Sequence, residues 1–284
     1  MEENVRKADG WLWLTLPIAI LLAITAGGGV GLSGLYRDQP SFAAQAIGQD
    51  LVSLAVVLPA LIISAFLARR GSGRAQMVWL GGLVYLVYTY AVAAFDVKFN
   101  LLFPAYVALL GCSLYALIGG LVTADMAGIK AGFTTQAPAR TVSIYLAVLA
   151  VLFYCMWLGE IVPALLAGRI PQSIQDNGTP TNAVHVLDMA WILPAFCITA
   201  VNLWRQRPLG YTLAGALLSY AVFLTLAILG MALFMIRAGH PVVFPQVLLF
   251  GLLMAISLGM LIVYLKAFEP PLIGGDKRSA ERIA

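Results

Sequence analysis

The stretch LPALIISAFLARR at residues 58–70 returns in outline as LPAFCITAVNLWR at residues 193–205. Each copy carries a proline, Pro59 or Pro194, inside an apolar run that ends at an arginine. Both copies keep the same spacing from proline to arginine. This pair predicts two equivalent membrane helices in two related halves of the chain.

The composition indicates a membrane protein. Of the 284 residues, 61% are hydrophobic and 11% are charged, whereas a soluble domain carries about 25% charged residues. Because so few charged side chains cannot cover a surface in water, we expect the lipid bilayer to be the main partner. The net charge of +4 comes from short basic clusters between apolar runs, which is typical of cytoplasmic loops. It does not indicate a nucleic-acid partner.

A helix needs about 20 mostly apolar residues to cross a bilayer, because no backbone polar group can stay unpaired in hydrocarbon. The sequence contains eight such segments, so we predict an all-α, polytopic protein with eight transmembrane helices in a single integral membrane domain, residues 1–284. The predicted spans are 11–33, 51–69, 77–97, 101–123, 143–167, 186–204, 209–236 and 244–267.

The distribution of basic residues predicts the orientation. Every second connecting segment is rich in lysine and arginine, and the segments between them hold one such residue each. Because basic loops stay in the cytoplasm, both termini should be cytoplasmic. The richer segments carry Arg6 and Lys7; Arg69, Arg70 and Arg74; Lys130 and Arg140; Arg205 and Arg207; and Lys266, Lys277, Arg278 and Arg282.

Further matches extend the internal similarity. Tyr85 and Tyr220 are separated by the same offset as Pro59 and Pro194, and Phe-Pro opens both the fourth and the eighth spans. Four spans per half let both halves enter the membrane from the same side, so we expect two parallel four-helix repeats. The repeats would be residues 11–123 and 143–267, with a cytoplasmic connector at 124–142, a cytoplasmic tail at 268–284, and outer loops at 34–50 and 168–185.

Acidic residues inside or beside membrane spans are candidates for function, because charge there is costly. Glu160 lies within the fifth span, where its alternative role is a hydrogen bond or ion pair between helices. His185 and Asp188 are three residues apart at the start of the sixth span and should share a helix face, where the carboxylate could orient the imidazole. Asp188 could instead cap the helix.

Asp50 and Asp96 complete the acidic set near the predicted outer side. Asp50 opens the second predicted span and could cap that helix, and Asp96 ends the third span close to Lys98. Together with Glu160 and Asp188, these residues predict a polar vestibule that faces outward between the halves.

The two prolines and one tyrosine are also candidates. Pro59 and Pro194 each remove a backbone donor and clash with the carbonyl four residues earlier, so the helices should kink there. The freed carbonyl could bind a cation or a substrate donor, or the prolines could serve packing alone. Tyr85 shares a face of the third span with Tyr88 and Thr89 and could line a pocket.

A resemblance adds context but no activity. The runs Phe99–Phe103, Tyr106–Leu109 and Ser113–Ile118, with Gln49–Val52 before the second predicted span, resemble a group of uncharacterised multi-pass membrane proteins of bacteria. The resemblance covers the first four spans and implies a prokaryotic plasma membrane.

No reaction or cofactor follows from the sequence. It contains no HExxH, GxSxG or Walker A motif, and two histidines are too few for a multi-histidine metal site. Three hypotheses remain: a transporter of small molecules or ions; a receptor or subunit that binds a small ligand such as a quinone or lipid; and an intramembrane acid–base enzyme using Glu160, His185 and Asp188. The identity of any cofactor or protein partner stays open.

Overall fold

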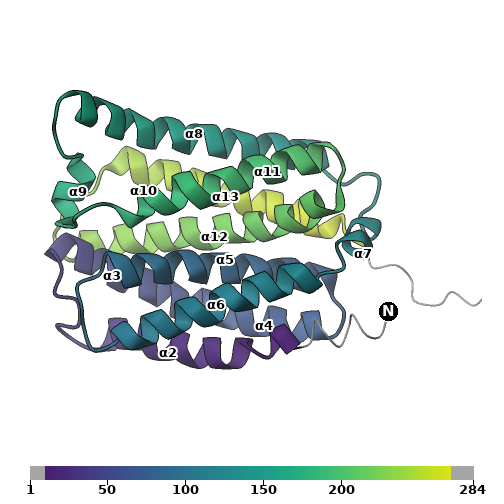
Figure 1. The fold of residues 1–284 in the computed structure, drawn as a ribbon, viewed down its shortest axis with the longest axis horizontal. Helices are drawn as coiled ribbons and strands as arrows, with labels where there is room; N and C mark the ends of the chain where they lie inside the picture. Colours follow the sequence, from purple (N-terminus) through teal and green to yellow (C-terminus); the bar gives the residue numbers. More distant parts are fainter. Residues whose placement is uncertain (1–9, 270–284) are drawn as a thin grey trace, which may run out of the picture.

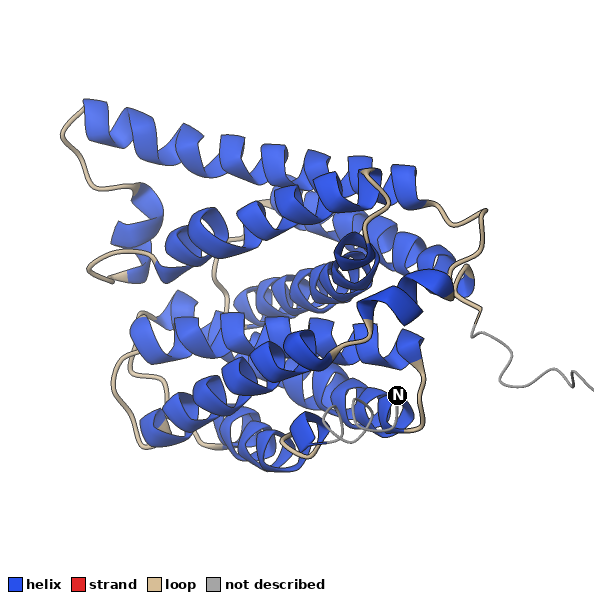
Figure 2. Ribbon diagram, turned by 45° about the vertical axis from the view of Figure 1, so that its right-hand side comes forward, coloured by secondary structure: helices blue, strands red, loops and turns tan. Residues whose placement is uncertain are grey.

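The computed structural model describes residues 10–269. Eight of its helices are long and apolar enough to cross a membrane, which confirms the predicted number of spans and the all-α fold. Figure 2 shows helices and loops and no strand in this part of the chain. Among the predicted orientation signals, Arg6, Lys7, Lys277, Arg278 and Arg282 lie outside the described residues, as does most of the predicted tail.

The helices follow one another with short connections. The first four spans comprise α2 (Thr15–Gly31), α3 (Pro40–Val52) with the π-helix η1 (Ser53–Val57) and α4 (Leu58–Arg69), α5 (Gly73–Phe95) and α6 (Phe103–Thr123). After the short α7 (Met126–Ala131), the last four comprise α8 (Ala139–Leu166), α10 (Ala183–Leu187) with η2 (Asp188–Ile192) and α11 (Leu193–Trp204), α12 (Pro208–Arg237) and α13 (Phe244–Lys266). The short α9 (Gln172–Asn177) follows α8.

Two ends of the bundle can be distinguished in Figure 1. The first and last described residues and α7 lie at one end, here called the α7 end. The helices α9 and α10 begin at the opposite end, here called the α9 end. All eight spans run between these two ends.

The second span begins earlier than predicted. Helix α3 starts at Pro40, so residues 40–50, which we predicted as part of a loop, are helical. Proline suits the first turn of a helix, and the alanines that follow favour helix formation. The prediction missed this segment because Gln45, Gln49 and Asp50 reduce its hydrophobicity. Asp50 therefore lies inside a helix, and its predicted capping role is wrong.

The core lies between α5 and α12, which pack against each other. Their central side chains are buried almost without interruption, including Trp79, Tyr85, Tyr90 and Tyr220. The surrounding helices expose large apolar side chains instead, for example Leu16 and Ile20 on α2. An apolar exterior around a well-packed interior suits a lipid environment.

The helix before each proline contains a π-helix, which we did not predict from the sequence; the predicted kink stays a prediction. The N–H of Leu58 bonds the carbonyl of Ser53, and the N–H of Leu193 bonds that of Asp188, five residues back in each case. A π turn holds one more residue than an α turn, which gives the proline ring space that an α-helix would deny it. The two π-helices occupy equivalent places in the two copies of the Leu-Pro-Ala stretch, since each ends directly before its leucine.

Close contact between α3 and α12 depends on glycine. A Cβ atom added to Gly48 would clash with the carbonyl oxygen of Gly230, and one added to Gly230 would lie 2.8 Å from the oxygen of Gly48. Small residues let membrane helices approach backbone to backbone. This contact joins the second span to the seventh and so holds the first half of the chain against the second.

We therefore predict that Gly48→Ala destabilises the protein, because the two backbones would have to separate. Overpacking of this kind costs about 1–3 kcal/mol. Gly111→Ala on α6 is the matched control, since nothing lies within 4 Å of a Cβ at that position. Thermal unfolding of both variants in detergent measures the difference. Equal midpoints for the two variants would contradict a tight α3–α12 contact.

Candidate functional site

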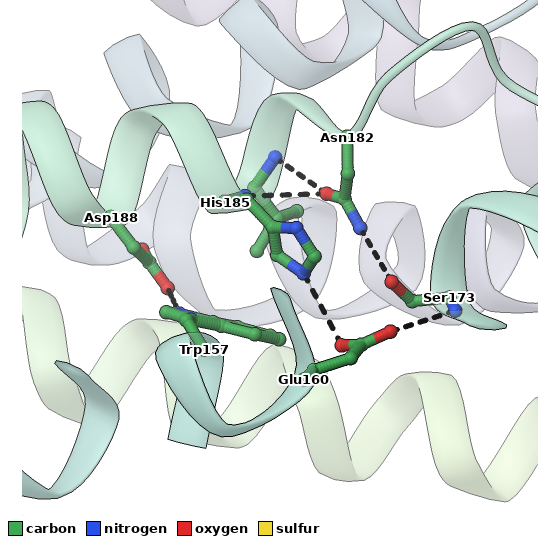
Figure 3. Close-up of polar contacts among 7 residues, drawn as sticks. Trp157, Glu160, Ser173, Asn182, His185 and Asp188 are labelled. Carbon is green, nitrogen blue, oxygen red and sulfur yellow. Dashed lines mark hydrogen bonds and ion pairs between the residues drawn. The ribbon is translucent and has the colours of Figure 1, made fainter. Parts of the chain in front are cut away.

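Glu160 and His185 form the centre of a polar cluster at the α9 end (Figure 3). The Oε2 atom of Glu160 lies 3.6 Å from Nε2 of His185, and its Oε1 atom accepts a hydrogen bond of 2.9 Å from the N–H of Ser173. Glu160 thus joins α8 to α9 by a hydrogen bond and lies beside His185 of α10, whose Nε2 atom has no hydrogen-bond partner among the described residues. The interhelical bond that we gave as its alternative role is present.

The start of α10 is fixed by an N-cap. The side-chain oxygen of Asn182 accepts hydrogen bonds from the N–H groups of Val184 and His185, at 2.9 and 3.3 Å. Asn182 also donates to the hydroxyl of Ser173 at 3.4 Å. Asparagine is a favoured N-cap because it satisfies these free donors. It therefore takes the capping role that the sequence offered to Asp188, and that alternative is wrong.

Asp188 lies one turn further along, at the start of η2, and contacts a different partner. The indole N–H of Trp157 donates a 2.8 Å hydrogen bond to its Oδ2 atom (Figure 3). The ring of Trp157 also lies 4.4 Å from that of His185, centroid to centroid. The prediction that Asp188 orients His185 is wrong, because Asp188 bonds Trp157 and His185 lies beside Glu160. The three residues proposed for acid–base catalysis do not form one chain of hydrogen bonds.

Asp50 belongs to a second polar cluster, formed by α2, α3 and the loop between them. The hydroxyl of Tyr36 donates a short hydrogen bond to Oδ2 of Asp50. Burial raises the pKa of Tyr36 well above its ordinary value, and the nearby Asp50 carboxylate adds to the effect. Tyr36 therefore remains a donor at neutral pH. Gly29 on α2 provides the space, because a Cβ there would clash with the Asp50 carboxylate and lie 2.8 Å from the Tyr36 hydroxyl.

A cavity of about 1030 Å³ joins these clusters. It is lined by side chains from α3, α5, α8, α11, α12 and α13, and by residues of the loops at the α9 end. Three of the predicted site residues, Asp50, Glu160 and Asp188, line this single cavity. Its volume lies at the upper end of the range of about 300–1,000 Å³ that is usual for small-molecule sites.

The cavity owes its space to an uneven packing of outer helices. In the first four spans α2 packs along α6, whereas α8 has few close contacts with α13. The hydroxyls of Tyr145 and Ser257 join α8 to α13 at 2.6 Å, and Phe153 lies 6.1 Å from Phe250 between ring centroids. Ser257, Phe153 and Phe250 all line the cavity. The deep part is therefore apolar and aromatic, and the end near α9 is polar.

The other predicted site residues lie outside the cavity lining. His185 does not line the cavity itself, although it contacts Glu160, which does. Pro59 and Pro194 do not line the cavity either. Tyr85 is buried and shares a 2.7 Å hydrogen bond with the hydroxyl of Ser53. Its predicted neighbours Tyr88 and Thr89 do line the cavity, so the predicted face of the third span is partly correct.

Asp96 has a structural contact at the α9 end. It is the C-cap residue of α5, and its Oδ2 atom accepts a 2.8 Å hydrogen bond from the N–H of Ala183 at the start of α10. Partial burial raises the pKa of Asp96, while this hydrogen bond and the nearby His185 oppose the rise. Asp96 therefore anchors α10 to α5 and lies outside the cavity lining.

The sequence reasoning missed several residues of the site. The two acids and the imidazole are held in place by Trp157, Ser173 and Asn182. In the sequence these three residues show only that they are polar and lie in or near a predicted span, which does not predict a role. Gln45 and Gln49 line the cavity from α3, a segment that we predicted as a loop. Their spacing of four residues was the available signal, because such residues share a helix face.

Comparison of the chain with protein-family models, with curated proteins and with solved structures found no match.

We predict that Gly29→Ala disrupts the Asp50 cluster, because the new methyl group would occupy the space of the carboxylate. The free energy of unfolding should fall by about 1–3 kcal/mol, as for other overpacked positions. Gly27→Ala on the same helix is the control, since nothing lies within 4 Å of a Cβ there. Thermal unfolding in detergent distinguishes the two. An unchanged midpoint for Gly29→Ala would show that Asp50 is not held against α2.

Proposed function

We propose that the protein is a membrane transporter for small molecules and that the cavity is its substrate site. The observation that carries this proposal is the cavity itself, within a bundle of eight candidate spans and lined by three acids predicted from sequence. Buried acids in a membrane are costly and are retained where they bind a substrate, an ion or a proton.

We also propose that the chain consists of two parallel repeats. Tyr85 packs on Phe223 with ring centroids 6.2 Å apart at 65°, and Tyr88 packs on Tyr220 at 5.8 Å and 64°. In the repeat alignment Tyr220 corresponds to Tyr85 and Phe223 to Tyr88, with the offset that relates the two prolines. Reciprocal contacts of this kind are what a two-fold axis between α5 and α12 produces. The matched π-helices and the matched arginine C-caps, Arg70 and Arg205, add support.

The proposed orientation puts the α7 end in the cytoplasm and opens the cavity outward. Basic residues at the α7 end lie over aromatic rings: Arg69 is 4.1 Å from the centroid of Trp13, and Arg140 is 5.7 Å from that of Trp204. Basic and aromatic residues of this kind favour the cytoplasmic membrane interface. The resemblance of the first four spans to bacterial proteins supports the plasma membrane of a prokaryote.

Binding without transport is the second candidate. The deep lining between α8 and α13 is apolar and aromatic, including Leu149, Phe153, Phe250 and Leu253. A quinone or lipid chain would suit that surface, and the protein would then be a receptor or ligand-binding subunit. Ligand-dependent thermal stabilisation with no solute flux in liposomes would favour this candidate over transport.

We predict that proteoliposomes containing the wild-type protein give solute-dependent currents on a solid-supported membrane. The solutes would be a panel of small organic cations, organic anions and inorganic ions. Glu160→Gln and Asp188→Asn should reduce the current about tenfold or more, because losing a buried charge that contacts a ligand costs on the order of 2 kcal/mol or more. Asp125→Asn, a cap residue at the α7 end, is the control and should retain the current.

Two outcomes would contradict this proposal. If no solute of the panel gives a current above that of protein-free liposomes, transport of charged small molecules is wrong. If Glu160→Gln and Asp188→Asn both keep the full wild-type current, the cavity is not the transport site.

A further inference from the structure

The ionisable residues that line the cavity, tyrosines aside, are almost all acidic. Four carboxylates line it, and no lysine or arginine is among the described residues that do; His240 is the one ionisable base among them. The basic residues at the same end lie elsewhere on the surface. The four carboxylates belong to Asp50, Glu160, Asp176 and Asp188. A cleft of one charge sign between low-dielectric walls concentrates ions of the opposite sign.

Asp188 lies among aromatic residues. Its carboxylate accepts the indole N–H of Trp157, and Tyr88, Phe196 and Tyr220 line the cavity as well. The rings of Tyr88 and Phe196 lie 5.8 and 6.4 Å from that of Tyr220. Aromatic faces attract organic cations, more strongly when the cation is desolvated. A carboxylate beside several rings is therefore suited to a positively charged organic group.

Tyr220 provides an independent observation. Its side chain is 1% exposed and lines the cavity, and its hydroxyl has no hydrogen-bond partner among residues 10–269. Tyr85, its counterpart in the first half of the chain, bonds the hydroxyl of Ser53. Asp188 lies at the position that corresponds to Ser53, but it bonds Trp157 instead. A buried hydroxyl without a partner is destabilising, and a ligand that bonds it would remove this cost.

The rest of the cavity lining indicates the chemistry of the rest of the ligand. From Asp188 the lining continues between α8 and α13 through Leu149, Phe153, Phe250 and Leu253. These side chains offer no charge and would bind an apolar body. A ligand that fills both parts would therefore carry its charge at one end.

We infer that the cavity binds an organic cation with an apolar body, its charged end at Asp188 and Tyr220 and its apolar part between α8 and α13. This inference names the substrate class of the proposed transporter and so rests on that function for its physiological meaning. Binding itself can be measured without transport.

The first experiment compares two probes of the same shape and opposite charge. Isothermal titration calorimetry of the purified full-length protein in detergent would measure tetraphenylphosphonium and tetraphenylborate in separate titrations. The cation should bind about tenfold or more tightly, because the lining carboxylates attract it and repel the anion. Equal affinities, or tighter binding of the anion, would overturn the inference. The comparison uses only the wild-type protein, so no variant has to fold.

The second experiment tests the position of the charge. Asp188→Asn should weaken binding of 4-phenylbutylammonium, an organic cation with its charge at one end, about tenfold or more. Asp96→Asn is the matched control, because Asp96 lies at the same end but does not line the cavity; it should leave the affinity within about twofold. An Asp188→Asn protein that elutes as the wild type does and keeps its affinity would overturn the assignment of Asp188.

The third experiment tests Tyr220 through the chemistry of the probe. 4-Phenylbutylammonium carries N–H donors, whereas tetraphenylphosphonium has none. Tyr220→Phe should weaken binding of the ammonium probe about fivefold, the equivalent of one hydrogen bond, and leave the phosphonium probe unchanged. Unchanged binding of the ammonium probe, or equal losses for both probes, would show that Tyr220 does not bond the charged end.

Flux separates this inference from the proposed function. Uptake of labelled tetraphenylphosphonium into proteoliposomes would be measured beside the binding titrations. Selective cation binding without uptake would leave the cation site standing and refute transport of this probe. Solute currents for other members of the panel, with no preference for cations in binding, would leave transport standing and refute the cation site.

Discussion

The interior of a lipid bilayer offers no hydrogen-bonding partner, so every polar group in the bundle depends on another part of the protein. Most of the interior meets this demand with pairs between helices. Thr25 bonds the hydroxyl of Tyr90 at 2.6 Å, Trp79 donates to Thr15 at 2.9 Å, and Gln49 donates to Thr89 at 2.9 Å. Such pairs fix the rotation of α2, α3 and α5 relative to one another. Among the described residues, the buried hydroxyls of Tyr106 and Tyr220 have no such partner, and both tyrosines line the cavity.

The prolines act on the site indirectly. Neither lines the cavity, but each is preceded by a π-helix that changes which side chains face the core. The π-helix η2 begins at Asp188, directly after the turn that carries His185. The turn from His185 to Asp188 is still α-helical, because the N–H of Asp188 bonds the carbonyl of Val184 four residues back. The two side chains therefore lie on one side of the helix, where Trp157 contacts both. Their polar partners differ, since Asp188 bonds Trp157 and His185 lies beside Glu160.

The two sets of four spans use similar sequence to different ends. Close packing of α2 along α6 fills the space that remains open between α8 and α13. The open side carries Asp188 and Glu160 together with the rings of Trp157 and Tyr220. In the proposed repeat, the outer helices of the first set therefore pack together, whereas those of the second set border the cavity. Under the proposed function, the apolar residues between α8 and α13 would contact the ligand.

The sequence alone determined the number of candidate spans, because an apolar run must reach a minimum length to cross the hydrocarbon core of the bilayer. It also singled out Asp50, Glu160 and Asp188, which line the cavity, because acidic residues are rare where charge is costly. The start of α3 could not be predicted from the sequence, because Gln45 and Gln49 line a cavity and lower the hydropathy of this segment. The pairing of Glu160 with His185, the bond between Trp157 and Asp188 and the cavity were decided only by tertiary structure. Each depends on the distance and rotation between helices far apart in sequence, and hydropathy carries no information about either.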